Sequence, residues 1–405
     1  MREGCRTRGR EDGREASESA NDDGLTTLQP VTLQPAPSED QDGVKIAIDV
    51  SSAAAARRSG VGVALVNILD ALAKIDSENE YLACYRLSRL KYSRHLYCPQ
   101  AGNFRRAIFQ EPVIFPRRAH VFHGGDARLP SCGSMPCTAT VYDVFSLVRT
   151  DFASASFREK KRRRYEHLVR RASRIFAASE STKNDLVSSL SISPQNIIVN
   201  HLGVSAEFHP RPAEEVDRIR RKYALPEAYA LSVAAFSKRK NIRRVLAAYS
   251  ALRKSHRIES TLVLAGSLEY WGDSRAALEQ SGVADSVILT GFVEDGDLPA
   301  LYSGARMFIF PSLYEGFGLP ALEAMACGVP LIASDRSSLP EIVGTAGLLV
   351  DPESDDAIRE RMAELDGDPG LRESLAARGL ERSKLFSWLK TAERMLATWR
   401  ELAGA

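Results

Sequence analysis

Residues 310–330 read FPSLYEGFGLPALEAMACGVP, and this segment indicates the fold class most clearly. An apolar strand stops at Pro311, a glycine-containing loop follows, and Pro320 suits the first turn of a helix. Gly328 fits the left-handed position just after that helix, and Pro330 prevents the helix from continuing. The segment is therefore predicted to be one strand–loop–helix unit of a parallel α/β sheet.

On both sides of residues 310–330, similar apolar runs alternate with helical patterns along most of the chain, as parallel sheets covered on both faces require. The expected strands fall at residues 44–50, 121–123, 138–143, 173–179, 196–200, 229–234, 261–266, 287–291, 307–311 and 331–334. This order predicts an α/β chain with two Rossmann-like, doubly wound parallel-sheet domains facing a cleft. Pro210 and Pro212 mark the expected linker.

The predicted parts of the chain are a disordered tail over residues 1–43, a first domain over 44–208, a second domain over 209–385, and a C-terminal helix over 386–405. The tail is polar and poor in aromatic residues, so it cannot bury enough apolar surface to fold. The chain has 405 residues and no run of about 18 apolar residues, so no membrane-spanning helix is expected.

Cysteine usage favours a reducing, cytoplasmic location, because the six cysteines are few and scattered. Cys132 and Cys137 are the one close pair, and no second pair stands at the spacing of a zinc site. Two Asp-x-Asp spacings, Asp295/Asp297 and Asp366/Asp368, lie beside helix starts and are interpreted as structural. We therefore expect no metal site and no cofactor.

Charge is unevenly distributed. Residues 44–205 carry 24 basic and 13 acidic side chains, whereas residues 206–405 carry 25 and 29. The densest basic run consists of Arg158, Lys160, Lys161, Arg162, Arg163, Arg164, Arg170, Arg171 and Arg174. It is either the solvated face of a helix or a surface attracted to anionic membrane headgroups or to a lipid-pyrophosphate acceptor. Nucleic acid is not expected, because no recognition motif accompanies the charge.

The loop and helix after Pro311 have the chemistry of a ligand site. A helix that starts at the carboxyl end of a parallel strand offers free N–H groups and a positive dipole end, which favour a phosphate. Glu315 would emerge at the crevice and Glu323 would lie in the first helical turn. A carboxylate near a bound phosphate is repelled by it, so these two side chains are expected to accept hydrogen bonds from sugar hydroxyls.

Glu315 and Glu323, within EGFGLPALEAMACG, closely resemble the paired-glutamate motif of the family 4 retaining glycosyltransferases, which have the GT-B fold. The resemblance extends from about residue 44 to about residue 390. It rests also on the following segments: SKRKN at 237–241, GFV at 291–293, LPALY at 298–302, ASESTK at 178–183 and NHLGV at 200–204. The resemblance implies mannosyltransferases of surface-polysaccharide assembly as relatives. It also implies that residues 44–208 form the acceptor-side domain, that residues 209–385 form the nucleotide-sugar donor domain, and that the helix over 386–405 packs back on the first domain.

The resemblance also implies a role for each matching residue. Glu323 would hold the donor ribose, and Glu315 would contact the transferred sugar. Arg239 and Lys240 would neutralise the leaving diphosphate. Other donor contacts would come from backbone or side chains at Gly316, Phe317, Gly318, Leu319, Gly60, Gly62 and Phe292. Gly60 and Gly62 also match two glycines of a dinucleotide fingerprint, but Leu65 stands at the third position, so NAD is not expected.

The chain departs from the family pattern at two positions. Ala235 stands where relatives often have Arg or Thr, so one phosphate contact is expected to be missing. Tyr142-Asp143 replaces the usual His-Asp pair, which leaves the place of the cleft histidine open. His123, in FHGG, is a candidate for that histidine in the same domain. The alternative is that His123 is a hydrogen-bonded structural residue at a strand end.

The sequence thus predicts a cytoplasmic, metal-independent retaining glycosyltransferase, peripheral on the inner face of the membrane. By resemblance it would move a hexose, with mannose as the best guess, from a GDP-sugar, or next a UDP-sugar, to a glycan or lipid-pyrophosphate acceptor. A GT-B nucleotide-sugar epimerase and a non-catalytic scaffold are the alternatives. Glu315→Ala and Lys240→Ala are expected to abolish transfer with almost no change in melting temperature.

Overall fold

The computed structural model describes residues 43–111, 114–116, 118–131, 133–233, 237–266 and 272–404. The predicted disordered tail, apart from Gly43, lies outside the described residues, as do Cys132 and Ala235.

The first sheet belongs to the N-terminal half, and its neighbouring strands are all parallel. Within the described part of the chain it has seven strands in the order β3-β2-β1-β4-β5-β6-β7. Their bounds are β1 Lys45–Asp49, β2 Glu80–Arg86, β3 Phe104–Phe109, β4 Val121–Gly124, β5 Cys137–Val141, β6 Arg174–Ala177 and β7 Ile197–Val199. The strand order reverses between β1 and β4, which is the switch point where open α/β sheets bind ligands.

The second sheet repeats this plan in the C-terminal half, again with parallel neighbours. Six strands of the described residues form it, in the order β10-β9-β8-β11-β12-β13. Their bounds are β8 Tyr229–Val233, β9 Thr261–Ala265, β10 Val287–Gly291, β11 Met307–Phe310, β12 Leu331–Ser334 and β13 Leu348–Val350. Its switch point lies between β8 and β11. The predicted pair of doubly wound sheets is confirmed.

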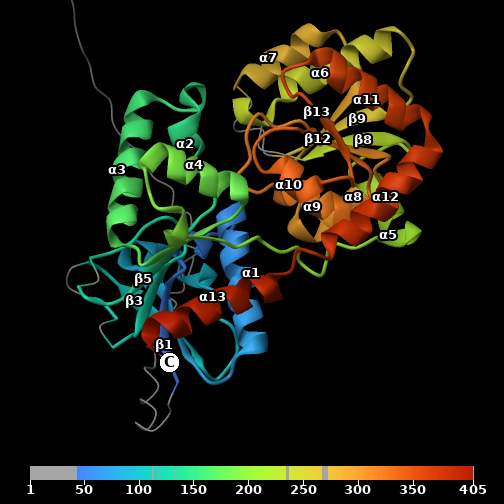
Figure 1. Cartoon of the computed structure of the whole chain (residues 1–405). Coiled ribbons are helices and arrows are strands. Elements are labelled where there is room, and N and C mark those ends of the chain that lie inside the picture. Colours follow the sequence, from blue (N-terminus) through green and yellow to red (C-terminus); the bar gives the residue numbers. More distant parts are fainter. Residues whose placement is uncertain are drawn as a thin grey trace, which may run out of the picture. The chain divides into compact units, whose positions relative to one another are not determined.

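Helices flank each sheet, as Figure 1 shows. In the N-terminal half they are α1 Gly60–Ile75, α2 Phe145–Val148, α3 Ala155–Arg171 and α4 Glu180–Leu190. In the C-terminal half they are α5 Ala213–Lys222, α6 Ile242–Lys254, α7 Gly272–Ser281, α8 Leu298–Ser303, α9 Leu319–Ala326, α10 Leu339–Val343, α11 Asp355–Gly367, α12 Pro369–Ser383 and α13 Trp388–Ala403. Among the described residues, none of these helices is long and apolar enough to cross a membrane.

Helix α13 lies beside α1 and against the first sheet, although it ends the chain (Figure 1). Trp399 is fully buried there, and its indole Nε1 donates a hydrogen bond to Thr138 Oγ1 on β5 at 2.9 Å. Asn200, just after β7, donates a side-chain hydrogen bond to the Thr391 carbonyl of α13 at 3.1 Å. The last helix is therefore part of the first sheet's packing.

Replacing Trp399 should show how much α13 stabilises the fold. We expect Trp399→Ala to lower the free energy of unfolding by about 4 kcal/mol, because a large buried side chain leaves a cavity. Leu389, on the same helix, is 42% exposed, and Leu389→Ala should cost less than about 0.5 kcal/mol. Urea unfolding of the two variants measures the difference. If Trp399→Ala lowered the free energy of unfolding as little as Leu389→Ala, the packing of Trp399 would add no stability.

Candidate active site

A cavity of about 560 Å³ lies between residues of the two sheets. From the N-terminal half it is lined by Arg58, Ser59, Gly60, Val61, Tyr142, Asp143 and Leu202. From the C-terminal half it is lined by Val233, Arg239, Lys240, Ala265, Gly266, Phe292, Val293, Asp295, Leu298, Glu315, Gly316, Phe317, Gly318, Leu319 and Pro320. These residues follow the carboxyl ends of strands or begin helices, so both sheets direct their ligand-binding edge toward this cavity.

The loop between β11 and α9 forms one wall, and its local chemistry follows from its glycines and prolines. Gly318 stands at the helix N-cap with φ 104°, which a residue with a side chain rarely adopts, and no side chain caps the helix. The N-terminus of α9 therefore directs its dipole and its uncapped first turn at the cavity. Gly328 ends the helix region with φ 71°, as the sequence predicted.

Glu315 is buried, and its carboxylate is held by two cations of the turn after β8. Lys240 Nζ lies 2.7 Å from Oε1, and Arg239 Nη1 lies 3.0 Å from Oε2. Burial alone would raise the pKa of Glu315, but Lys240 and Arg239 together lower it, so the carboxylate is ionised. The three residues form one half-buried cluster with a single net positive charge. The sequence predicted almost no change in melting temperature for Glu315→Ala and Lys240→Ala. These ion pairs change that prediction to a lower melting temperature, because either substitution leaves a charged side chain with fewer partners.

Glu323 is partly buried on α9, and it is not among the residues that line the cavity. Tyr302 donates its hydroxyl to the Glu323 carboxylate at 3.0 Å. Burial raises the pKa of Glu323 to about 7, with Glu207 and Asp295 raising it further and Tyr302 and Lys240 opposing. Asp295 lines the cavity, so the Glu323 carboxylate lies near that end of it.

The glycines of the first loop differ in position. Gly60 lines the cavity and has no atom within 4 Å of where a Cβ would lie. Gly62 is not among the lining residues; a Cβ there would meet the Ser52 carbonyl at 2.8 Å, which makes Gly62 a packing residue of α1. Across the cavity, the Arg57 guanidinium lies 4.4 Å from the Phe292 ring centre, so Phe292 contacts the N-terminal half.

Gly316 connects the two halves through its backbone. Its carbonyl accepts hydrogen bonds from Ser179 Oγ at 2.7 Å and from Thr182 Oγ1 at 3.1 Å. A Cβ at this position would lie 1.9 Å from the Tyr142 carbonyl and 2.6 Å from Asp143 Cβ. Only a residue without a side chain permits this approach.

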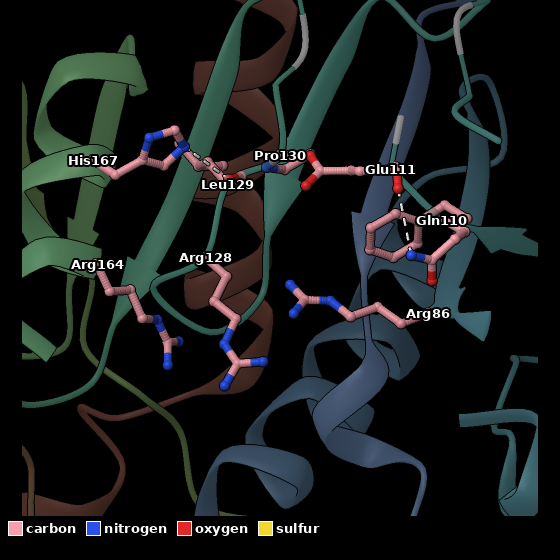
Figure 2. A pocket seen from close by; sticks show the side chains of 9 residues that line it. Arg86, Gln110, Glu111, Arg128, Leu129, Pro130, Arg164 and His167 are labelled. Atoms are coloured by element: carbon pink, nitrogen blue, oxygen red, sulfur yellow. Dashed lines mark hydrogen bonds between the residues drawn. The ribbon is translucent and has the colours of Figure 1, made fainter. Parts of the chain in front are cut away.

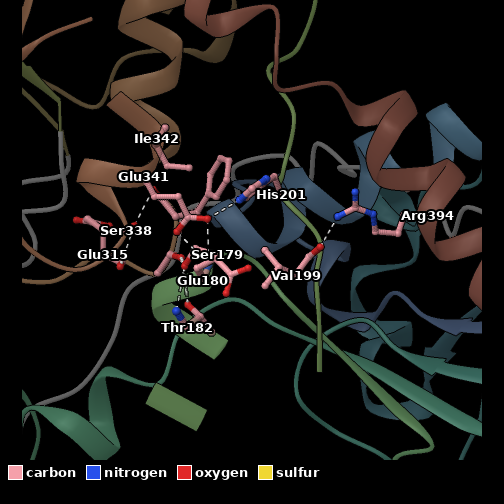
Figure 3. A network of polar contacts seen from close by, with 12 residues as sticks. Ser179, Glu180, Thr182, Val199, His201, Glu315, Ser338, Glu341, Ile342 and Arg394 are labelled. Carbon is pink, nitrogen blue, oxygen red and sulfur yellow. Dashed lines mark hydrogen bonds and ion pairs between the residues drawn. The ribbon is translucent and has the colours of Figure 1, made fainter. Parts of the chain in front are cut away.

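A second connection lies beside it. The carboxylate of Glu341, on α10, accepts hydrogen bonds from the backbone N–H of Glu180 at 3.0 Å and from His201 Nε2 (Figure 3). Ser338 Oγ donates to the carbonyls of Glu315 and Phe317, which fixes the loop that carries Glu315. The loop between β11 and α9 and the contact between the halves thus belong to one polar network.

His123 does not reach the cavity, which corrects its expected role as a cleft histidine. Its ring is fully buried on β4, with Nδ1 2.9 Å from Thr138 Oγ1 and Nε2 3.2 Å from Thr140 Oγ1. Burial lowers the pKa of His123 to about 3, so the ring is neutral. Tyr142, at the position of the missing family histidine, does line the cavity. Its buried hydroxyl has no hydrogen-bond partner among the described residues.

The acidic pairs have structural partners. Asp297 is held by Lys222 Nζ at 2.5 Å and by Arg218 Nη2 at 3.2 Å, and Asp368 caps α12 by accepting from the Leu371 N–H at 2.9 Å. Within the described ranges no group of three or more His, Cys, Asp or Glu side chains is arranged to hold a metal ion.

Three cavity-lining residues had no predicted site role: Arg58, Leu202 and Asp295. Arg58 stands two residues before Gly60 and Leu202 lies inside the NHLGV segment, so their positions in the sequence were the available signal, whereas Asp295 had been interpreted as structural.

The comparisons with known proteins agree with this geometry. The family model for glycosyl transferases group 1 matches residues 215–382. The O-antigen chain mannosyltransferase B of Escherichia coli is 36% identical over 276 residues, which cover 66% of this chain and 71% of that protein. The MMP alpha-(1->4)-mannosyltransferase of Mycolicibacterium hassiacum is 30% identical over 242 residues, 58% of this chain and 56% of that one. The Escherichia coli serotype-specific mannosyltransferase WbdA matches at 36% identity over 28% of its own length.

Among solved structures, sucrose-phosphate synthase from Thermosynechococcus elongatus superposes with a TM-score of 0.71 at 21% identity, covering 89% of this chain and 99% of that one. WaaG, a glycosyltransferase involved in lipopolysaccharide biosynthesis, superposes with a TM-score of 0.67 at 14% identity, covering 89% and 100%. These two likenesses concern the fold, which is GT-B as predicted. With the paired parallel sheets, the cavity between them and the sequence relatives, the chain belongs to the group 1 glycosyl transferases.

Proposed function

We propose that this chain transfers a hexose, with mannose as the first candidate, from a nucleotide-diphosphate sugar to a glycan or lipid-linked acceptor. The observation that carries the proposal is the half-buried Arg239–Lys240–Glu315 cluster beside the N-terminus of α9. The identity to mannosyltransferases supports the choice of sugar. Neither the epimerase nor the scaffold alternative has support from these relatives.

The cluster fits a leaving diphosphate by charge. Two cations face one carboxylate, so one positive charge remains for the negative charge that builds on the leaving phosphate. Glu315 uses both carboxylate oxygens on these cations, so we assign it first to holding them in place and to no covalent step. The uncapped turn of α9 adds positive dipole ends on the same side.

In the proposed reaction the anomeric configuration of the sugar is retained. The bond between the anomeric carbon and the phosphate oxygen breaks, and the acceptor hydroxyl attacks from the face that the diphosphate leaves. The hydroxyl proton passes to the departing phosphate oxygen, so no outside base is required. Because Arg239, Lys240 and α9 supply positive charge, we propose that transfer needs no metal ion and expect it to continue in EDTA.

The donor is tested by thermal shift with GDP, UDP, ADP and dTDP, followed by transfer with the matching sugars. We expect GDP to raise the melting temperature most, with UDP next. No shift with any nucleoside diphosphate would contradict the proposal.

For the location of the protein, we propose the cytoplasmic side of the membrane, with the exposed side chains of Lys160, Arg162, Arg163 and Arg170 facing anionic headgroups.

Nucleotide-sugar binding should depend on pH through Glu323. The ribose is expected to bind the carboxylate form, and with a pKa of about 7 that form is lost as the pH falls from 8 to 6. The dissociation constant of a nucleotide sugar, whose diphosphate does not titrate in this range, should rise roughly tenfold. In the free protein, the effect of pH on stability has the opposite direction to its effect on binding. Because folding raises the pKa of Glu323, protonation of this carboxyl stabilises the fold at low pH, and this contribution is lost as the pH rises through 7.

Glu323→Gln separates these effects. Its affinity should match that of the unmodified protein at pH 6 and stay constant up to pH 8. Isothermal titration calorimetry at both pH values gives the comparison, and a variant with an unchanged pH profile would refute the role of Glu323.

A further inference from the structure

A cavity of about 310 Å³ lies at the carboxyl edge of the first sheet. It is separate from the cavity of about 560 Å³ described above, which we call the donor cavity. The cavity of about 310 Å³ is lined by residues at the ends of β2 and β3, in the loop after β4, and on α3: Arg86, Phe109, Gln110, Glu111, Arg128, Leu129, Pro130, Arg164 and His167. A neighbouring cavity of about 230 Å³ shares Arg86 and Arg128 and adds Asp49 and Ser51 after β1. The two cavities occupy the β1/β4 switch point, where open α/β sheets bind ligands.

Three arginines converge on this space. Figure 2 shows Arg86 and Arg164 on either side of Arg128, each with its guanidinium turned toward the middle. Arg86 Nη2 pairs with Asp49 at 2.8 Å, and Arg164 Nη2 pairs with Asp126 at 2.7 Å.

Arg128 differs from its two neighbours. Its guanidinium makes no hydrogen bond or ion pair with any described residue, and the side chain is exposed to solvent. Partial burial lowers the pKa of Arg128, the neighbouring charges of Arg164 and Arg86 lower it further, and the carboxylates of Asp126 and Asp49 oppose this shift. Arg86 and Arg164 each form an ion pair with one of these carboxylates, whereas Arg128 lies beside two like charges without an ion pair of its own among the described residues. An anion in the cavity would remove this repulsion.

The remaining charged groups around the two cavities carry both signs, and the acidic ones already have partners. Arg89 and Lys91 line the neighbouring cavity. Glu111 is the one acidic lining residue of the larger cavity, and its carboxylate already accepts the Ser131 N–H at 2.6 Å. His167 Nε2 lies 3.2 Å from the Leu129 carbonyl.

Lys161 lies on the same helix as Arg164. Burial lowers the pKa of Lys161, the charge of Arg164 lowers it further, and the charges of Asp126 and Asp143 oppose this shift. Lys161 and Arg164 lie on the inward face of α3, one turn apart, whereas Lys160 and Arg163 face solvent. The basic run of α3 is thus divided between a solvated face and a face that serves this cavity.

We propose that the three arginines bind a phosphate or pyrophosphate group of the acceptor, so that the acceptor is an anionic phosphoester. Guanidinium groups match phosphate oxygens in forked pairs, and several of them around one cavity favour a group with several oxygens. The acceptor's role in this statement rests on the transferase function proposed above. The anion site itself rests only on the cavity and its charges.

The first test measures inorganic phosphate binding by isothermal titration calorimetry. Arg128→Ala should weaken binding at least tenfold, and Arg128→Lys should recover part of the loss because it keeps the charge without the fork. The matched control is Arg170→Ala, an exposed arginine of α3, and it should change affinity less than twofold. Lys240→Ala should also leave this binding intact, since phosphate bound at the donor site would respond to Lys240. Equal weakening by Arg170→Ala, or no weakening by Arg128→Ala, would overturn the site.

The second test identifies the source of the phosphate. Vesicles of phosphatidylcholine with phosphatidic acid, which carries a phosphomonoester headgroup, are compared with phosphatidylcholine alone by co-sedimentation. Loss of phosphatidic acid binding in Arg128→Ala but not in Arg257→Ala, an exposed arginine of the C-terminal half, assigns the site to a lipid headgroup. Loss of inorganic phosphate binding alone assigns it to a soluble phosphate ester. Unchanged binding of both probes in Arg128→Ala contradicts the inference.

Transfer assays separate this inference from the proposed function. Arg128→Ala should raise KM for a phosphorylated acceptor at least tenfold and leave the nucleotide thermal shift unchanged. Equal increases in KM for phosphorylated and neutral acceptors would refute anion recognition. If no nucleoside diphosphate binds while phosphate binding still depends on Arg128, the proposed function fails and the anion site stands.

Discussion

Lys240→Ala should lower kcat/KM for sugar transfer by at least a hundredfold. The Lys240 ammonium lies 2.7 Å from the buried Glu315 carboxylate, and an oriented cation at a developing phosphate charge contributes about 3 kcal/mol to transition-state stabilisation. The same change should lower the free energy of unfolding by about 3 kcal/mol, since Glu315 then has Arg239 alone as its cation.

Lys238→Ala is the matched control for this experiment. Lys238 belongs to the same turn, its side chain is 60% exposed, and its partner Asp151 lies 3.4 Å away. An exposed pair of this kind contributes little, so transfer should fall less than threefold. Steady-state kinetics and thermal unfolding of both variants decide the matter. Similar losses in the two variants would show that the turn provides general charge and that Lys240 has no specific place.

Gly316→Ala should abolish transfer even though it adds a single methyl group. The new Cβ would stand 1.9 Å from the Tyr142 carbonyl, so the loop carrying Glu315 must separate from the N-terminal half. The hydrogen bonds from Ser179 and Thr182 to the Gly316 carbonyl would be lost with that movement. We expect transfer to fall at least a hundredfold and the melting temperature to decrease.

Gly367→Ala provides the comparison, because no atom lies within 4 Å of a Cβ at that position, at the end of α11. It should leave transfer and melting temperature close to those of the unmodified protein. Full activity in Gly316→Ala would show that the close approach to Tyr142 is not needed for catalysis.

Much of the site was predictable because its signals are local. The strand, loop and helix of residues 310–330 are specified by Pro311, Pro320 and Gly328, and the structure places them as predicted. Three strands were not predicted. β2 and β3 carry charged or polar residues among their apolar ones, including Arg105 and Arg106 on β3 at the sheet edge, and β13 has three residues.

The fate of His123 could not be read from its own segment. Whether a strand-end histidine faces a cleft or the core depends on neighbours distant in sequence. Here those neighbours are Thr138 and Thr140 on β5 and the Trp399 ring of α13, whose centre lies 5.3 Å from that of His123. The expected role of Glu315 as a sugar contact likewise omitted its ion pairs, because pairing with Arg239 and Lys240 follows from the sheet order.

The anomeric configuration of the product shows whether the protein transfers the sugar with retention, as proposed. The unmodified protein is incubated with GDP-mannose and a phosphorylated acceptor, and the anomeric proton of the product is followed by NMR. We predict a new glycosidic bond with the same anomeric configuration as the donor, absent with Lys240→Ala and present with Lys238→Ala. An inverted product, or hydrolysis to free mannose and GDP with no glycoside formed, would contradict the proposed retaining transfer.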